Sequence, residues 1–275
     1  MAEVDLHLHT TASDGRLSPT ELVRLLAKRG LRMAAITDHD TTNGLDEAFE
    51  EAANHPGLTL IPGIELSADV PGNEVHMLGY HIDRQDEDLQ EALKEFQAGR
   101  VDRGRDMVEK LGELGLPVSW ERVQELAQGT VGRPHIAQAM VERGYIEHVA
   151  QAFDKYLGRN GLAYSERVKL TPEGAVRLIT QAGGVAVLAH PIYTTDYIDM
   201  LPGLKAAGLV GMEVHYSTLS RDAIADLARV AKEHDLLPCG GSDYHAMDKP
   251  DEALPGQAGP PLEVAERLAD LASRR

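Results

Sequence analysis

The N-terminal segment of the chain carries two histidines separated by a single residue, His7 and His9. The surrounding Val4, Leu6 and Leu8 predict a strand, in which residues i and i+2 point to the same face. Both imidazoles therefore project together, as a metal-binding pair would. Further ligand-type side chains follow along the chain and strengthen this interpretation: Asp14, His39, Glu65, His76, His190, Asp243 and His245.

These donors are imidazoles and carboxylates, without a thiolate, because the single cysteine, Cys239, lies in an apolar run and is interpreted as a small buried residue. Such a set suits Mn²⁺, Zn²⁺ or Fe²⁺, whereas Mg²⁺ alone would use mostly oxygen ligands. We expect two to three divalent metal ions, with Mn²⁺ favoured. Two ions ~3.5–4 Å apart activate a shared water and hold the oxygens of an in-line displacement. A nucleophilic side chain is then unnecessary, and Ser242 is interpreted as a turn residue.

Seven short apolar runs rich in Val, Ile and Leu, bounded by Gly, Pro and charged residues, predict strands. They are Val4–Leu8, Arg32–Thr37, Leu58–Ile64, Glu74–Ile82, Val185–Ala189, Leu209–His215 and Leu236–Gly240. The ligand-type residues lie within these runs or, more often, at their C-terminal ends. Barrels and open α/β sheets assemble their active sites at that end, so the pattern predicts one shared site in an α/β fold.

The middle of the chain has a different hydrophobic pattern from the rest. From about Glu87 to Arg177 the strand signals vanish, and apolar residues recur with helical periodicity between glycine and proline breaks. We expect a helical insert domain at residues 98–171, acting as a substrate lid, within a barrel formed by residues 1–97 and 172–275. Basic and acidic residues are nearly balanced between Lys94 and Arg177, so this part repels a phosphate least. A last helix is predicted from Leu262 to Ala272.

Composition limits the possible partners. The 275 residues, 43% of them hydrophobic, suffice for one large α/β domain with an insert. No apolar run approaches the roughly 20 residues that span a bilayer, and no signal peptide precedes the first strand, so we expect a cytoplasmic protein without a membrane partner. A net charge of −17 argues against coating nucleic acid, and three Phe, one Trp and eight Tyr argue against a long stacking track. The sequence does not set the oligomeric state.

Three side chains near the predicted ligands admit two interpretations each. Asp38 and Asp40 flank His39 and are either carboxylates that orient imidazoles or ordinary N-cap or surface residues. His215 follows the strand that begins at Leu209 and is either a substrate contact and proton donor to the leaving oxygen or a buried or rim histidine.

Arg133 and His135 could clamp a substrate phosphate, because a guanidinium binds phosphate through two parallel hydrogen bonds. Pro134 between them also suits the start of a helix. Four other basic residues of the same segment are interpreted as solvated helix faces: Arg100, Arg103, Lys155 and Arg159.

The motifs together resemble a known family. They are His7-Leu8-His9, Ser13-Asp14-Gly15, Thr37-Asp38-His39-Asp40, Gly63-Ile64-Glu65, Val75-His76, Ala189-His190-Pro191 and Gly241-Ser242-Asp243-Tyr244-His245. In this order they resemble the polymerase and histidinol phosphatase (PHP) family of metal-dependent phosphoesterases. The resemblance covers the whole chain. Gly132-Arg133-Pro134-His135, Tyr156-Leu157-Gly158 and Ala163-Tyr164 resemble the branch of this family that carries a helical insert.

The resemblance implies an α/β fold, a distorted (β/α)7 barrel with a helical insert domain and three metals at its mouth. It divides nine ligands among these metals: His7, His9, Glu65 and Asp243 for the first, Glu65 with His76 and His190 for the second, and Asp14, His39 and His245 for the third. The ligands of the first metal, together with His215, are the expected catalytic residues. Family members often have histidine at the position of Asp14.

For function, the resemblance implies hydrolysis of nucleotide phosphate esters by a metal-activated hydroxide. The expected substrates are nucleoside 3′,5′-bisphosphates or the 5′ ends of short oligonucleotides, bound with the help of Arg133, His135 and His215. Histidinol phosphate phosphatase activity is the alternative, although no residue can be assigned to an imidazole and amine pocket. A non-catalytic accessory module is a third possibility, which the full ligand set disfavours.

Overall fold

The computed structural model describes residues 2–70, 73–127, 129–166, 170–217, 219–247 and 252–275. Its centre is a seven-stranded sheet in the order β1 to β7. The strands are β1 Val4–Asp5, β2 Met33–Ile36, β3 Thr59–Val70, β4 Asn73–Tyr80, β5 Val185–Leu188, β6 Leu209–Tyr216 and β7 Leu237–Gly241. Each of the seven predicted apolar runs overlaps one of them.

The sheet curves until its first and last strands meet. Leu6 N–H donates to Gly240 O at 3.3 Å, and Leu8 forms a parallel bridge with Tyr244. Most neighbours pair in parallel, but β4 runs antiparallel to both β3 and β5. The expected distorted barrel is therefore confirmed, with β3 and β4 paired as antiparallel neighbours. We call the end where β1, β2, β5, β6 and β7 finish the mouth of the barrel.

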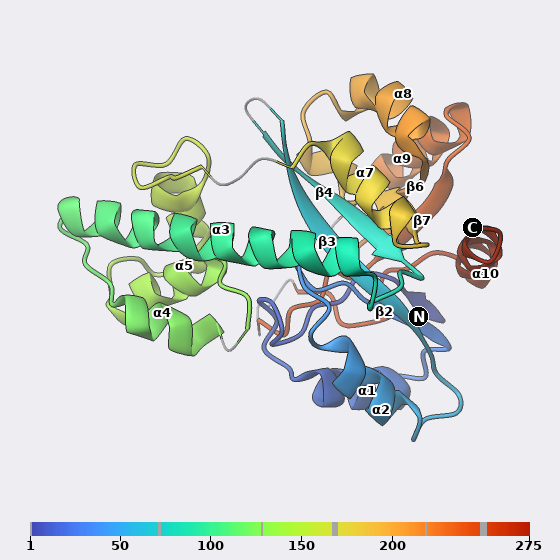
Figure 1. Cartoon of the computed structure of the whole chain (residues 1–275), viewed down its shortest axis with the longest axis horizontal. Coiled ribbons are helices and arrows are strands. Elements are labelled where there is room, and N and C mark those ends of the chain that lie inside the picture. Colours follow the sequence, from blue (N-terminus) through green and yellow to red (C-terminus); the bar gives the residue numbers. More distant parts are fainter. Residues whose placement is uncertain (1, 71–72, 128, 167–169, 218, 248–251) are drawn as a thin grey trace.

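Helices cover the outside of the sheet (Figure 1). Those that follow the barrel strands are α1 Pro19–Lys28, α2 Leu45–Ala52, α7 Pro172–Gln181, the short 3₁₀-helix η2 Pro191–Tyr193, α8 Tyr197–Ala207, α9 Arg221–Glu233 and α10 Leu262–Ala272. The first illustrates why they form where they do. The Ser18 hydroxyl caps α1 by accepting from Glu21 N–H, the Glu21 carboxylate accepts from Ser18 N–H, and Pro19 is the first residue of the helix.

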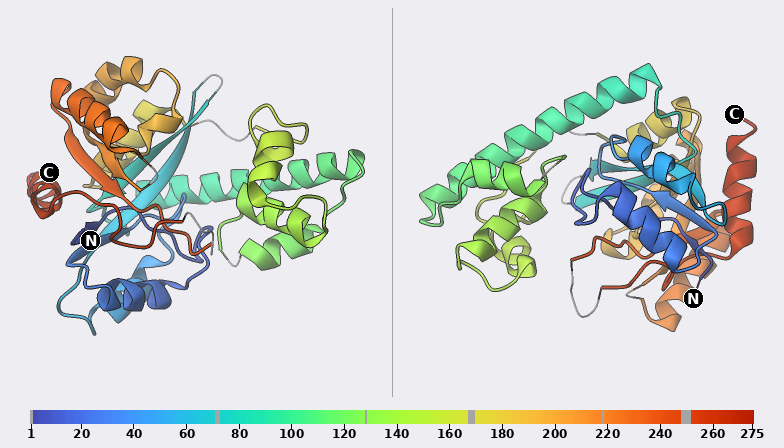
Figure 2. Two further views of the ribbon diagram at one scale, coloured as in Figure 1. Left: turned by 180° about the vertical axis from the view of Figure 1, so that it is seen from behind. Right: turned by 90° about the horizontal axis from the view of Figure 1, so that it is seen from below.

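Between β4 and α7 the chain leaves the barrel. It forms α3 Glu87–Glu113, α4 Trp120–Ala127, α5 Arg133–Glu142, α6 Val149–Ala152 and the π-helical turn η1 Phe153–Leu157. Figures 1 and 2 show α3 running from the barrel into this separate group of helices. Leu89 and Leu93 at the start of α3 pack in the barrel core, whereas Met107 and Leu111 near its end pack in a second core. This one helix thus anchors the insert to the barrel.

Two smaller expectations concern single elements. The last helix has the predicted bounds, Leu262–Ala272, and Cys239 is fully buried. Among the described residues, no helix combines the length and the apolar character that crossing a membrane requires. The domain division at residues 98 and 171 stays a prediction.

Candidate metal centre

Glu65 lies at the centre of the barrel mouth, and only 1% of its surface is exposed. Imidazole nitrogens surround both of its oxygens at 2.7–3.3 Å: His7, His9 and His39 at Oε2, and His76 and His190 at Oε1. Hydrogen bonding alone does not account for five imidazoles around one carboxylate. The arrangement is the one expected of donors gathered for cations.

Strand register explains how these donors meet. Side chains alternate along β3, so Glu65 and Ser67 face the inside while Ile64, Leu66 and Ala68 pack in the helix-covered core. The pairing of β3 with β4 sets Ser67 opposite His76. Ala189 N–H then donates to His76 O at 3.0 Å, which places the next residue, His190, beside the same cluster.

The pair of histidines at the N-terminus meets a carboxylate that follows β7. His7 Nε2 and His9 Nε2 each lie 3.2 Å from Asp243 Oδ1. Asp243 has φ 54° and His190 has φ 24°, a region that costs a non-glycine residue of order 1–3 kcal/mol. Both strained residues contribute donors to the cluster, so the fold maintains this cost at the mouth.

Asp14 lies on the loop between β1 and α1 and forms the third part of the cluster. Its Oδ1 is 3.3 Å from His245 Nε2, and its Oδ2 is 3.8 Å from His39 Nε2. The donors form three sets, and within each set the ligand atoms lie within 4.8 Å of one another. The sets are His9, Asp14, His39 and His245; His7, His9 and Asp243; and His39, Glu65 and His76. With His190, which contacts Glu65, all nine residues expected as ligands lie at one mouth.

Burial and the neighbouring carboxylates shift the pKa values of the clustered imidazoles in opposite directions. Burial lowers the pKa of His9, but hydrogen bonds and charges from Asp243 and Glu65 raise it to about 10. Burial likewise opposes protonation of His76, and the Glu65 carboxylate raises its pKa to about 9. For His39 burial dominates and lowers the pKa to about 3. The carboxylates thus favour the charged form of His9 and His76, whereas burial favours the neutral form of His39.

A buried glutamate that the sequence analysis did not identify supports two of the histidines. Glu213 is fully buried in β6; its Oε1 lies 3.1 Å from His7 Nδ1, and its Oε2 accepts from His190 N–H at 2.7 Å. A carboxylate at Nδ1 holds the proton there and leaves Nε2 free to bind a metal. A lone acidic residue within the apolar run from Leu209 was the signal that could have identified it.

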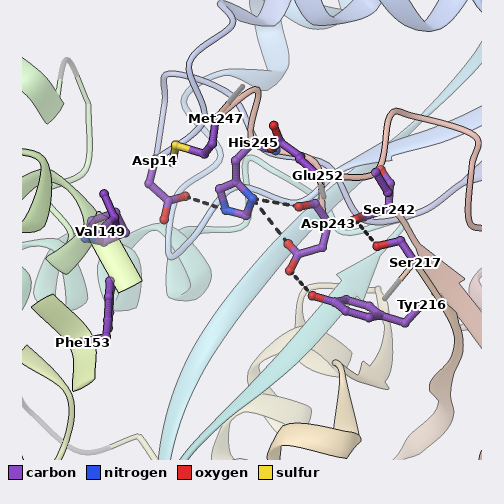
Figure 3. Close-up of a pocket in the computed structure, with 12 residues that line it drawn as sticks. Asp14, Val149, Phe153, Tyr216, Ser217, Ser242, Asp243, His245, Met247 and Glu252 are labelled. Carbon is purple, nitrogen blue, oxygen red and sulfur yellow. Dashed lines mark hydrogen bonds and ion pairs between the residues drawn. The ribbon is translucent and has the colours of Figure 1, made fainter. Parts of the chain in front are cut away.

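Tyr216 is the second supporting residue that sequence reasoning missed. Its hydroxyl donates to Asp243 Oδ2 at 2.6 Å, so the other oxygen faces the histidines (Figure 3). The pairing of β6 with β7 shifts register between Glu213 and His215. Such a bulge changes which side of the strand faces the mouth. Within the described residues, His215 makes no side-chain hydrogen bond, ion pair or ring contact, and its proposed contact with substrate stays a prediction.

Asp38 and Asp40, left open between two interpretations, are both buried. Asp38 accepts from Thr10 N–H and from the Thr10 hydroxyl, each at 2.7 Å, and from Ser13 Oγ at 2.6 Å. It therefore orients the loop that carries Asp14. Asp40 accepts from Ser67 N–H at 2.9 Å and is itself held by an arginine of α3. Neither is a surface residue, and both position the polypeptide around the donors.

Two arginines of α3 differ from the expectation. Arg100 and Arg103 are 7% and 4% exposed, so their interpretation as solvated helix faces was wrong. Arg100 Nε donates to Asp40 at 2.6 Å. Both arginines lie on the face of α3 that carries the buried Leu93 and Met107, so their spacing agrees with burial and only their charge favoured solvent exposure. With Arg133 they line a cavity of about 160 Å³, which we call the arginine cavity and which also reaches His39 and His76.

Arg133 is the first residue of α5 and forms an ion pair with Glu74 of β4. Its guanidinium also lies over the Phe153 ring, 5.4 Å from the ring centroid. His135 is 8% exposed and its Nδ1 accepts from Gly132 N–H at 3.0 Å, so the ring caps the helix. Both interpretations of this segment are compatible with the geometry, because a helix start here also directs basic groups toward the cluster.

The other two basic residues of the insert lie farther along the chain. Lys155 is exposed, in agreement with its interpretation. The Arg159 side chain is 19% exposed and lies 3.5 Å from Asp69 at the end of β3. Arg159 thus forms a third ion pair between insert and barrel, besides those of Arg100 and Arg133.

Comparisons with known proteins agree with this geometry. The model of the PHP domain matches residues 5–157. A 5′-3′ exoribonuclease of Haemophilus influenzae is 38% identical over 245 residues, covering 88% of this chain and 89% of the relative. A 3′,5′-nucleoside bisphosphate phosphatase of Chromobacterium violaceum is 34% identical, covering 98% of this chain and 94% of the relative.

A solved structure gives the same result for the fold. An amidohydrolase from Chromobacterium violaceum, with sulfate bound and no metal, superimposes with a TM-score of 0.89 at 31% identity. The alignment covers 98% of this chain and 97% of that one. The family model covers more than half of the chain, and the relatives and the solved structure cover 88–98% of it, so the chain belongs to the PHP domain family.

Proposed function

We propose that the chain is a metal-dependent phosphoesterase that hydrolyses phosphate esters of nucleotides. The observation that carries the proposal is the buried Glu65 surrounded by five imidazoles, with Asp14 and Asp243 completing the donor set. The named activities of both curated relatives, on nucleoside bisphosphates and on RNA from its 5′ end, support the substrate class.

The donors fit divalent metal ions. Within the described cluster, four buried imidazole nitrogens make no well-directed hydrogen bond: both of His9, Nδ1 of His39 and Nδ1 of His190. An unpartnered buried polar atom is costly unless it binds something that the protein itself does not supply. Imidazole mixed with carboxylate and lacking thiolate suits Mn²⁺ first, with Zn²⁺, Fe²⁺ or Mg²⁺ as alternatives.

The contacts divide the donors as follows. We assign His7, His9, Glu65 and Asp243 to one ion, Glu65 with His76 and His190 to a second, and Asp14, His39 and His245 to a third. When bound, such ions activate water and polarise phosphoryl oxygens. Glu65 would be shared between two ions, while Glu213 and Tyr216 hold His7 and Asp243 in place.

The arginine cavity supplies the positive charge that a second phosphate needs. Arg100, Arg103 and Arg133 line it beside His39 and His76, and its volume of about 160 Å³ is small. Guanidinium groups bind phosphate through parallel hydrogen bonds and keep their charge at every physiological pH. We therefore assign the non-reacting phosphate of a nucleoside bisphosphate to this cavity, with residues 98–171 serving as the lid.

A small substrate fits the overall charge better than a long nucleic acid. The chain carries −17, so no general attraction to a polyanion exists outside the local arginines and bound cations. The reaction would transfer a phosphoryl group to water, so that the ester P–O bond breaks and the departing oxygen takes up a proton. Arg133 and its neighbours would orient the substrate, and no side chain would become covalently modified.

Product formation in the presence of Mn²⁺ tests the proposal, measured as inorganic phosphate from the phosphomonoesters and as inorganic phosphate or mononucleotide from the RNA. The panel compares adenosine 3′,5′-bisphosphate, a short 5′-phosphorylated RNA and histidinol phosphate. We expect turnover of the two nucleotides and little or none of histidinol phosphate. Faster turnover of histidinol phosphate than of either nucleotide would replace the proposed substrate class with the alternative derived from sequence.

A further inference from the structure

Glu74 of β4 carries a carboxylate that faces two different parts of the site. Its Oε1 lies 3.6 Å from His76 Nε2, and its Oε2 forms the ion pair with Arg133 at the start of α5. Residues two apart on a strand point to the same side, so Glu74 and His76 face the barrel mouth together. All three side chains line the arginine cavity. One carboxylate therefore joins an expected metal ligand to an arginine of the insert.

The contact of Glu74 with His76 resembles that of Glu213 with His7. His76 Nδ1 lies 2.7 Å from Glu65 Oε1, so this nitrogen faces the other donors while Nε2 faces Glu74. A carboxylate at one ring nitrogen holds the proton there and leaves the opposite nitrogen free to bind a metal. At 3.6 Å the contact is longer than the 3.1 Å between Glu213 and His7, so its effect on metal binding should be smaller.

Arg133 in turn holds this carboxylate in place. Its guanidinium lies over the Phe153 ring, 5.4 Å from the ring centroid, and donates to Glu74 Oε2. The Arg133 and Glu74 side chains are only 18% and 19% exposed, so solvent and salt screen the pair weakly. Removing Arg133 would take away a buried partner of the carboxylate and would allow it to turn away from His76.

The facing strand provides a comparison. Asp69 of β3 lies directly opposite Glu74 in the sheet register, and its Oδ1 lies 3.5 Å from Arg159 of the insert. Like charges directly opposite each other destabilise a sheet, and here each carboxylate pairs with an arginine of the insert. Among the described residues, Asp69 belongs to no donor set, whereas Glu74 contacts a member of one, His76. Both arginines join the insert to the barrel, but Arg133 does so through a carboxylate that contacts a metal ligand.

We propose that Arg133 strengthens binding of the second ion through Glu74, so that a residue of the insert increases the metal affinity of the barrel. Glu74 is a positioning residue, which orients His76 and neither binds the ion nor reacts. Metal binding at this site then depends on how the insert lies against the barrel. The inference rests on the proposed function, which assigns Glu65, His76 and His190 to the second ion.

Isothermal titration with Mn²⁺ in the absence of substrate tests the inference. Glu74→Gln keeps the shape of the side chain and removes its charge, and Arg133→Ala removes its partner. We expect each to lower the affinity for one of the bound ions by about three- to tenfold, less than a carboxylate in closer contact with its histidine would. The double variant should lose no more than the larger single loss, because both changes break the same connection. Arg159→Ala is the matched control, which breaks the neighbouring ion pair and should stay within about twofold of wild type.

The outcomes separate this inference from the proposed function. Unchanged or higher Mn²⁺ affinity in either Glu74→Gln or Arg133→Ala would overturn the inference, as would additive losses in the double variant. An equal loss in Arg159→Ala would also overturn it, because the effect would then come from displacement of the insert. If the wild-type protein hydrolyses adenosine 3′,5′-bisphosphate while these affinities are unchanged, the inference fails and the proposed function stands. If the wild-type protein neither binds Mn²⁺ nor hydrolyses the nucleotides, both are refuted.

Discussion

The contact between Glu213 and His7 gives a prediction that separates metal binding from chemistry. Both side chains are fully buried, and Glu213 Oε1 lies 3.1 Å from His7 Nδ1 while Oε2 accepts from His190 N–H at 2.7 Å. Glu213→Gln keeps the shape but removes the charge. Its amide has one oxygen and one NH₂ group, so it can accept at only one of the two positions. At the other position the NH₂ group of the glutamine faces an N–H group, so that two hydrogen-bond donors meet.

The magnitude follows from these two contacts. A hydrogen bond to a charged group contributes about 1.5–3 kcal/mol. Loss of that amount corresponds to roughly a ten- to hundredfold weaker metal site, which is the range seen when a carboxylate behind a metal-binding histidine is changed. We expect the Mn²⁺ concentration for half-maximal activity to rise by this factor. At saturating Mn²⁺, kcat should stay close to wild type, because Glu213 does not touch the substrate.

Isothermal titration with Mn²⁺ and activity measured against Mn²⁺ concentration provide the assay. Glu51→Gln is the matched control, since Glu51 also lies 3.0 Å from a histidine nitrogen, that of His55, but away from the mouth. The control should leave Mn²⁺ affinity unchanged. An unchanged affinity in Glu213→Gln, or a loss of kcat at saturating metal with unaltered affinity, would refute the reasoning.

Four further outcomes are expected. Elemental analysis of purified protein should find two to three transition-metal ions per chain, and chelation should abolish activity; at most one ion with full activity after chelation would contradict the donor assignment. Glu65→Ala and Asp243→Ala should abolish turnover even with excess Mn²⁺. Arg133→Ala should lower kcat/KM by roughly ten- to a hundredfold, because one charged phosphate contact contributes about 1.5–3 kcal/mol. Wild-type rates of Arg133→Ala on every phosphorylated substrate would make Arg133 a structural residue. Adenosine 3′,5′-bisphosphate should be preferred over the 3′- and 5′-monophosphates, and the preference should shrink when Arg133 and His135 are both replaced, because binding of the remote phosphate helps position the reacting one; equal rates on all three would remove the second phosphate site. The pKa values of His9 and His76 are raised to about 10 and about 9, so each imidazole holds a proton below that pH and must lose it to bind a cation. Mn²⁺ affinity, measured by competition at pH 6.5 and 8.5, should therefore be higher at pH 8.5. Equal affinities at the two pH values would contradict this origin of the shifts.

The barrel and its donor set could be predicted because they depend on local signals. Each strand is a short apolar run, and strand alternation or the C-terminal end of a parallel strand determines where donors such as His7 and His190 lie. His76 shows the limit of the second rule. It lies within β4, which runs antiparallel, and it reaches the mouth through its pairing with β3 rather than by following a strand.

Residues whose role depends on two distant elements could not be found this way. Arg100 and Arg103 share a helical face with the buried Leu93 and Met107, but a charged side chain is ordinarily assigned to solvent, and their carboxylate partners in the barrel are distant in sequence. Tyr216 reaches Asp243 because the pairing of β6 and β7 shifts register, which no composition signal reports. Glu213 differs, since a carboxylate within an apolar strand is visible in the sequence and burial of such a group requires a partner.

The uneven charge of the chain acquires a physical meaning in this arrangement. The barrel supplies imidazoles and carboxylates that need cations, while α3 and α5 supply the guanidinium groups of Arg100, Arg103 and Arg133. A phosphate at the junction would meet bound cations on one side and fixed positive charge on the other. Because the guanidiniums are themselves held by Asp40 and Glu74 of the barrel, the same ion pairs that join the insert to the barrel also orient its positive charge. Breaking either pair should therefore affect phosphate binding and insert placement together, which would account for the buried arginines of α3 and α5.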